Sequence, residues 1–156
     1  MTSVSAKCST FFLTTLNASS SINGNTITFT NFNIFQLLGD MYHQYDQFKI
    51  VLNSYSNYNA STVANTCVAI KMSGLSFDYC FDYGTNLSTM ATLGMVNVAS
   101  AGVQLTQLQA NFGTVFSKPP PSVNLIIYLY DVKTNTIVSS TNYGSSFFSF
   151  TIYGIK

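Results

Sequence analysis

Strict alternation of apolar and polar residues is the feature that most constrains the fold of this 156-residue chain. In residues 25–32, NTITFTNF, Ile27 and Phe29 fall on one side and the threonines fall on the other. Successive side chains of a strand point to opposite faces of its sheet, so this spacing predicts a strand with one buried face. The same period recurs in residues 47–55 (QFKIVLNSY), 66–72 (TCVAIKM), 75–83 (LSFDYCFDY) and 147–155 (FFSFTIYGI).

Four further stretches are also predicted to form strands. Residues 8–16, CSTFFLTTL, read as an early strand, and residues 123–132, VNLIIYLYDV, are apolar on both faces, as expected of a central strand covered on both sides. Residues 136–143 follow the turn sequence VKTN and are expected to pair back on that central strand. Residues 95–105 would tolerate a helix, but we favour two short strands about Gly102.

These strands predict one all-β domain over residues 1–156, with about eight strands arranged as an antiparallel β-sandwich or jelly roll. The run SKPPPS, residues 117–122, is expected to be a stiff extended connector because proline fixes its backbone angle.

One segment breaks the β pattern and predicts one short helix near residues 34–45. Asn33 is a suitable N-cap, and one helical stripe holds the apolar residues Ile34, Leu37, Leu38, Met41, Tyr42 and Tyr45. His43, the only histidine, falls opposite that stripe between Asp40 and Asp46. The three polar residues could form a metal site or an acid/base pair, but zinc needs three or four ligands. We favour a solvated or interface-facing side of the helix.

The chain offers few other groups for chemistry. A nucleophilic triad would have to use His43, and no GxSxG sequence accompanies it. On a strand, Asp78 and Asp82 would stand roughly 13 Å apart, too far to share a proton. The cysteines Cys8, Cys67 and Cys80 show no CxxC spacing and are expected to be buried free thiols. We therefore expect no enzymatic activity, no metal, no cofactor and no small-molecule substrate.

Charged residues make up only 7% of the chain, against roughly 25% in ordinary soluble domains. They are six lysines and five aspartates, and net charge is +1. A surface of this kind has little self-repulsion, so we expect it to be buried against other chains or to lie outside a cell. The lysines are scattered along the sequence and arginine is absent, which argues against nucleic-acid binding.

No apolar run approaches the roughly 20 residues of a membrane span, so membrane insertion is not expected. The first twenty residues show no signal peptide, because no basic region precedes an apolar one.

The run FTNFNIFQLLGDMYHQYDQFKIVL, followed by AIKMSGLSFDY, resembles the single jelly-roll capsid proteins of icosahedral viruses. In that family a short helix leads into the third strand through an aromatic Y-x-x-F step, which here is Tyr45 to Phe48. The resemblance implies two four-stranded sheets and side-by-side subunit packing. Many such proteins carry a basic N-terminal arm for the genome, but residues 1–48 hold one lysine. This departure favours a vertex (penton) or minor capsid protein of a large double-stranded DNA virus, one that does not contact the genome.

The resemblance implies a homo-oligomer, with a pentamer favoured over a trimer, that also contacts other capsid proteins in a virion assembled inside the host cell. We take residues 85–96, TNLSTMATLGMV, and residues 118–122, KPPPS, as candidate interface loops. The candidate contact residues of the subunit interface are Tyr79, Tyr83, Met90, Met95, Pro119, Pro120 and Pro121. The alternative is an extracellular jelly-roll binding module, either lectin-like or trimeric like tumour-necrosis and complement domains. A pilus-like subunit is a third hypothesis.

Overall fold

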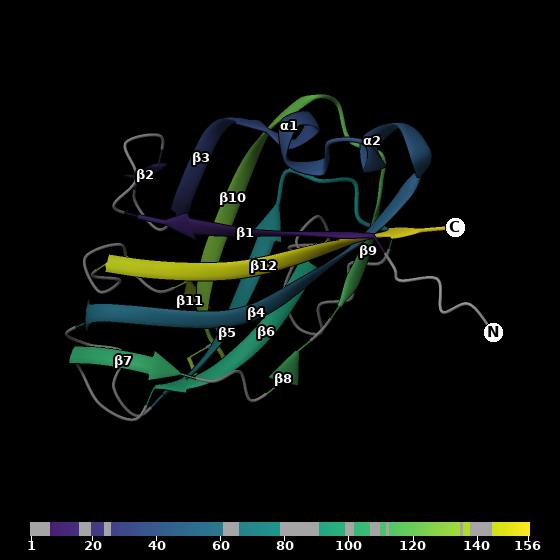
Figure 1. Cartoon of the computed structure of the whole chain (residues 1–156). Coiled ribbons are helices and arrows are strands. Elements are labelled where there is room, and N and C mark those ends of the chain that lie inside the picture. The colour runs from purple at the N-terminus through teal and green to yellow at the C-terminus, as the bar shows by residue number, and fades with distance from the viewer. Residues whose placement is uncertain are drawn as a thin grey trace.

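The structure is a computed structural model of the chain (Figure 1). It describes residues 7–15, 20–23, 26–60, 66–78, 91–98, 102–106, 110–111, 113–134, 136–137 and 145–156.

Two antiparallel sheets pack face to face, which confirms the predicted β-sandwich (Figure 1). Sheet A has the order β1 (Cys8–Thr14), β12 (Ser145–Ile155), β4 (Gln47–Ala60) and β7 (Gly102–Thr106), and β9 (Thr114–Ser117) also pairs with β4. Sheet B has the order β2 (Ser20–Asn23), β3 (Thr26–Asn33), β10 (Ser122–Asp131), β5 (Thr66–Ser73), β6 (Ala91–Val98) and β8 (Ala110–Asn111). The short β11 (Thr136–Ile137) pairs with the end of β10, as the turn sequence predicted.

The strand pairs are nested along the chain. The first strand, β1, pairs with the last, β12, and β3 pairs with β10. Inside these pairs, β4 pairs with β7 and β9, and β5 pairs with β6. This is the pairing of one long hairpin rolled into two sheets, which is the jelly roll.

The predicted inward faces form the core between the sheets. Ile27 and Phe29 of β3 are buried, and so is every second residue of the longer strands: Phe48, Ile50, Leu52, Val68, Ile70, Met72, Phe148, Phe150 and Ile152. Stacked and tilted rings fill much of this space, including the pairs Phe11–Phe150 and Phe48–Phe116. Burial of these side chains is the main contribution to folding.

The helical segment consists of two short helices, whereas the sequence predicted one. Asn33 caps α1 (Ile34–Leu38) as expected, because its side-chain oxygen accepts a hydrogen bond from the Gln36 amide at 2.9 Å. Gly39 then takes a positive φ of 54° and ends α1, and α2 (Met41–Gln44) begins after Asp40. The apolar side of the segment still faces the core, since Ile34, Leu38 and Met41 are buried.

Two strand predictions differ from the structure. Residues 75–78 form no named strand. Their one β-bridge joins Phe77 to Phe116 of β9, and the Asp78 amide donates to the Val115 carbonyl beside it. Gly74 turns the chain before this bridge at φ 103°. Residues 79–83 lie outside the described residues. Strand β10 is central in sheet B, but only one of its faces is fully buried. On the other face Asn124 is exposed and Tyr128 is half-buried, because no described element covers that side.

Candidate interaction surfaces

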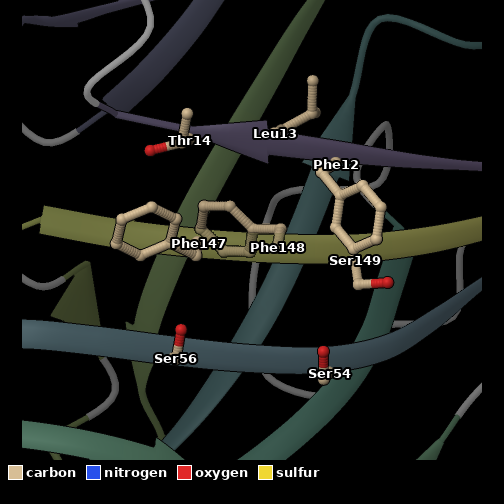
Figure 2. A pocket seen from close by; sticks show the side chains of 8 residues that line it. All are labelled: Phe12, Leu13, Thr14, Ser54, Ser56, Phe147, Phe148 and Ser149. Carbon is tan, nitrogen blue, oxygen red and sulfur yellow. The ribbon is translucent and has the colours of Figure 1, made fainter.

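The outer face of sheet A carries two exposed phenylalanines. Phe12 of β1 is 75% exposed, although it directly follows the buried Phe11. Phe147 of β12 is 40% exposed, although it directly precedes the buried Phe148. Strand alternation requires this, since neighbouring side chains of one strand point to opposite faces. Figure 2 shows both rings on the same side of the sheet.

A shallow depression of about 280 Å³ lies beside these rings. Its outward-facing lining is the set that we call the sheet-A face: Phe12, Thr14, Ser54, Ser56, Phe147 and Ser149 (Figure 2). Every polar group in this set is a hydroxyl and none is ionised. The sheet-A face is therefore aromatic, hydrogen-bonding and electrically neutral.

Hydroxyl and amide groups continue this neutral surface beside the depression. The hydroxyls of Thr10 and Thr151 lie 3.1 Å apart across the β1–β12 pair. The Asn53 side-chain amide donates to the same Thr151 oxygen at 2.8 Å. These polar groups hydrogen-bond to one another within the sheet. Removing water from this surface therefore costs less free energy than removing it from a surface whose polar groups have no partners.

The charges gather at one end of sheet A. Lys7 directly precedes β1, and its carbonyl accepts from the Gly154 amide. Lys49 lies opposite Tyr153, and the Lys118 amide donates to the Asp46 carbonyl at 2.8 Å. Lys156 follows the last residue of β12. The fold thus brings together four lysines that are scattered in the sequence, close to both ends of the described chain (Figure 1).

Aspartates share this end of the sheet with the lysines. Asp46 directly precedes β4, and Asp78 accepts hydrogen bonds from the Gln47 and Ser117 side chains. Asp40 precedes α2, whose Gln44 side chain accepts a hydrogen bond from Lys7. The end of sheet A is thus of mixed charge rather than basic, and the sheet-A face is left without charge.

The described candidate interface residues lie in two places. Met95 is half-buried on β6, opposite Ala69 of β5. Pro120 and Pro121 are exposed on the connector before β10, whereas Pro119 is buried within the subunit. Tyr79, Tyr83 and Met90 lie outside the described residues. The assignment of these seven residues to an interface stays a prediction.

The proline connector is fixed against the two helices. The Tyr42 hydroxyl donates to the Pro119 carbonyl at 2.8 Å, and the Phe35 amide donates to the Pro121 carbonyl at 3.1 Å. The Lys118 ammonium lies 4.8 Å from the centre of the Tyr42 ring, a cation–π distance. The connector is therefore an ordered corner of the molecule.

His43 is exposed, and its ring lies edge-on to Phe35 and Tyr42 with centroids 5.6 and 5.7 Å apart. Within the part of the chain that the structure describes, no three potential metal ligands come together. None of the helices formed by those residues has the length and hydropathy of a membrane-crossing helix.

Sequence reasoning missed the outward role of Phe12 and Phe147. The missed pattern is the doubled phenylalanine at residues 11–12 and 147–148. Inside a strand with one buried face, two adjacent phenylalanines must place one ring outside. Because both pairs lie in neighbouring strands, their outward rings lie on the same face of sheet A.

The two described cysteines are free thiols, and Cys8 is exposed rather than buried as predicted, because it lies on the outward-facing side of β1. Partial burial, with a smaller contribution from the Asp131 carboxylate, raises the pKa of the Cys67 thiol. Because the thiolate is the reactive form, we expect iodoacetamide near neutral pH to alkylate Cys8 faster than Cys67. Peptide mapping by mass spectrometry measures both alkylation rates. Faster labelling of Cys67 would contradict the exposed position of Cys8 and the raised pKa of the Cys67 thiol.

Comparison with models of known protein families gives no match, and comparison with curated proteins gives no similar sequence.

Proposed function

We propose that this protein is a structural subunit of an icosahedral viral capsid. In this proposal it is a single jelly-roll vertex (penton) or minor capsid component that packs side by side with its own copies and with other capsid proteins. A pentamer is favoured over a trimer. The subunit does not contact the genome and acts only through its geometry, in a virion assembled inside the host cell.

The separation of charged and neutral surface carries this proposal. Four of the six lysines and three of the five aspartates lie at one end of the sandwich, while the sheet-A face carries none. Charged residues are depleted at the core of protein interfaces, whereas aromatic residues are enriched there. We therefore expect the neutral sheet-A face to contact a neighbouring subunit and the charged end of sheet A to remain exposed to water.

The strand pairing and the aromatic step give further support. Tyr45 packs over Gly154 so closely that an added Cβ there would lie 2.6 Å from the ring. Three residues later, Phe48 is fully buried and stacks on Phe116 with centroids 5.6 Å apart. The step thus attaches the helical segment to β12 and β9. Many unrelated functions share this fold, so the surface chemistry is the stronger support.

The purified chain is expected to form discrete oligomers with five-fold symmetry and to show no enzymatic turnover. Light scattering after size exclusion measures their mass, and negative-stain class averages show their symmetry. Because neutral surfaces drive the contact, the oligomers should persist at an ionic strength of about 1 M, where charge interactions beyond roughly 3 Å are screened. A chain that stays monomeric at high concentration, or oligomers that dissociate in salt, would contradict the proposal.

The depression on the sheet-A face favours one second candidate, a lectin-like extracellular binding module. Two aromatic rings beside several hydroxyls are groups that stack on and hydrogen-bond to a neutral sugar. Binding to a glycan array with a defined preference, lost in Phe147→Ala but kept in the His43→Ala control, would support it. Absence of binding at millimolar sugar concentrations would rule out the lectin-like function.

A further inference from the structure

Strand β1 is an edge of sheet A, and its free edge has a defined set of backbone groups. Among the described residues its one neighbour in the sheet is β12. The Thr15 amide donates to Ser146 and the Gly154 amide donates to Lys7, so the odd-numbered residues face β12. In an antiparallel pair the hydrogen-bonding direction alternates along the strand. The N–H and C=O groups of Cys8, Thr10 and Phe12 therefore point away from the sheet.

The same three residues are exposed at their side chains. Natural edge strands are usually blocked by a charge, a proline or a bulge. Strand β1, CSTFFLT, has no charge and no proline, and its register with β12 is regular from Cys8 to Thr14. The core side of the strand is occupied, because the Ser9 hydroxyl donates to the Leu37 carbonyl of α1 at 3.0 Å. Among the strands that the structure describes, none pairs with this outer edge, so it can act as a template for another strand.

We propose that β1 pairs with β1 of a second copy of this chain, antiparallel and about a two-fold axis beside Thr10. Thr10 then lies opposite Thr10 of the second copy, and Cys8 lies opposite Phe12. The outward N–H and C=O groups of the three residues are all used within this one pairing. The two A sheets join into one continuous sheet, and the exposed Phe12 ring is covered.

A second copy fits this edge because the pairing is self-complementary and meets no like charge. No residue of β1 is ionised. The nearest charge is Lys7, and in this register the two Lys7 residues stand six residues apart along the paired strands, roughly 20 Å. That separation exceeds the screening length of about 8 Å at physiological salt.

The contact goes beyond the proposed function, since a two-fold pair differs from the ring contacts of a pentamer. Its five-residue ribbon is short, and interfaces that bury less than about 1,200 Å² in total are typically weak. We therefore expect a dimer that dissociates on dilution, which analytical ultracentrifugation across the micromolar range can follow.

Charge placed on the edge is the first test. Phe12→Lys is expected to weaken the dimer across the concentration series, because it removes the ring that the pairing covers and places on the paired strand a lysine, the residue that blocks many natural edge strands. Phe147→Lys is the matched control, since it adds the same charge to the same face but one strand away from the edge. It should keep dimerisation within a few-fold of the wild type. Equal loss in both variants, or in neither, would overturn the edge pairing.

A disulfide tests the register. Thr10→Cys in a Cys8→Ser background is expected to form a covalent dimer on mild oxidation, because directly opposed Cα atoms about 5.5 Å apart suit a disulfide. Thr151→Cys in the same background lies on β12 opposite Thr10 and should not cross-link. If the chain forms five-fold rings but Thr10→Cys never cross-links, the edge pairing fails and the capsid proposal stands. If only the two-fold dimer forms, the pentamer proposal fails and the edge pairing stands.

Discussion

Replacing Gly74 with alanine is expected to lower the free energy of unfolding by about 3 kcal/mol or more. Gly74 has a φ of 103°, in the region that side chains rarely adopt, and an added Cβ would lie 1.9 Å from the Asn124 carbonyl oxygen. That oxygen belongs to the backbone of β10, which is paired on both sides with β3 and β5. The clash could be relieved only by moving β10, a central strand of sheet B. Backbone strain at residue 74 and displacement of β10 would therefore both lower the free energy of unfolding.

Two other glycines provide matched controls for this variant. Gly39 also has a positive φ, 54°, but an added Cβ meets nothing within 4 Å, so Gly39→Ala carries only backbone strain of about 1–3 kcal/mol and displaces no neighbouring strand. At Gly113 the added Cβ would meet the flexible end of Lys49, which can move aside. Urea denaturation of the three variants should rank Gly74→Ala as the most destabilised. A Gly74→Ala protein as stable as Gly39→Ala would show that β10 does not approach this turn as described.

The period-two pattern was enough to predict the sandwich and most of its core. Ile27, Phe48, Ile70 and Phe150 are buried as their alternation indicated, since one face of each strand has to leave water. The two short strands about Gly102 also form, as β6 and β7. Such local signals were reliable because residues of one strand share a face whatever the partner strand is.

Features that depend on the arrangement of the strands were not predicted. The sequence separates Lys7, Lys49, Lys118 and Lys156 widely, and only the register of β1, β12, β4 and β9 brings them to one end of sheet A. The open edge of β1 likewise follows from the strand order, because a strand pattern does not say which strand is outermost.

The helical segment shows how a local conformation can override a periodic pattern. The helical wheel placed the apolar residues of this segment correctly, and Ile34, Leu38 and Met41 do face the core. The wheel assumed a continuous helix, however, and the positive φ of Gly39 interrupts it. Glycine is the residue that adopts this conformation at least cost, so Gly39 was the available sign of the break.

Of the candidate site, the proline connector was predicted as a stiff extended segment and a candidate interface, but the sheet-A face was not predicted. The alternation of residues predicts one buried face for each strand. Phe11 and Phe148 lie on that face, whereas their neighbours Phe12 and Phe147 are exposed on the opposite face. The neutral surface follows from composition, whereas its position beside an open edge required the structure.

The doubled phenylalanine of β12 gives the second large effect, because Phe147 and Phe148 are adjacent and point to opposite faces. Phe148 is 1% exposed, and the centroid of its ring lies 5.2 Å from that of Tyr55 and 6.2 Å from that of Phe150. Phe148→Ala removes a buried ring and leaves a cavity in the core between the two sheets, so it should cost about 3–5 kcal/mol. Phe147→Ala changes the same residue type one position earlier at the surface and should cost less than about 1 kcal/mol.

Urea denaturation at low protein concentration measures both free energies without a contribution from self-association. The two variants lose the same atoms from the same strand, so a difference between them reports only which side of sheet A each ring occupies. Equal destabilisation would mean that Phe147 is also buried in the folded chain. The sheet-A face would then have one exposed ring instead of two, and this neutral surface, on which the capsid proposal depends, would be smaller than the structure indicates.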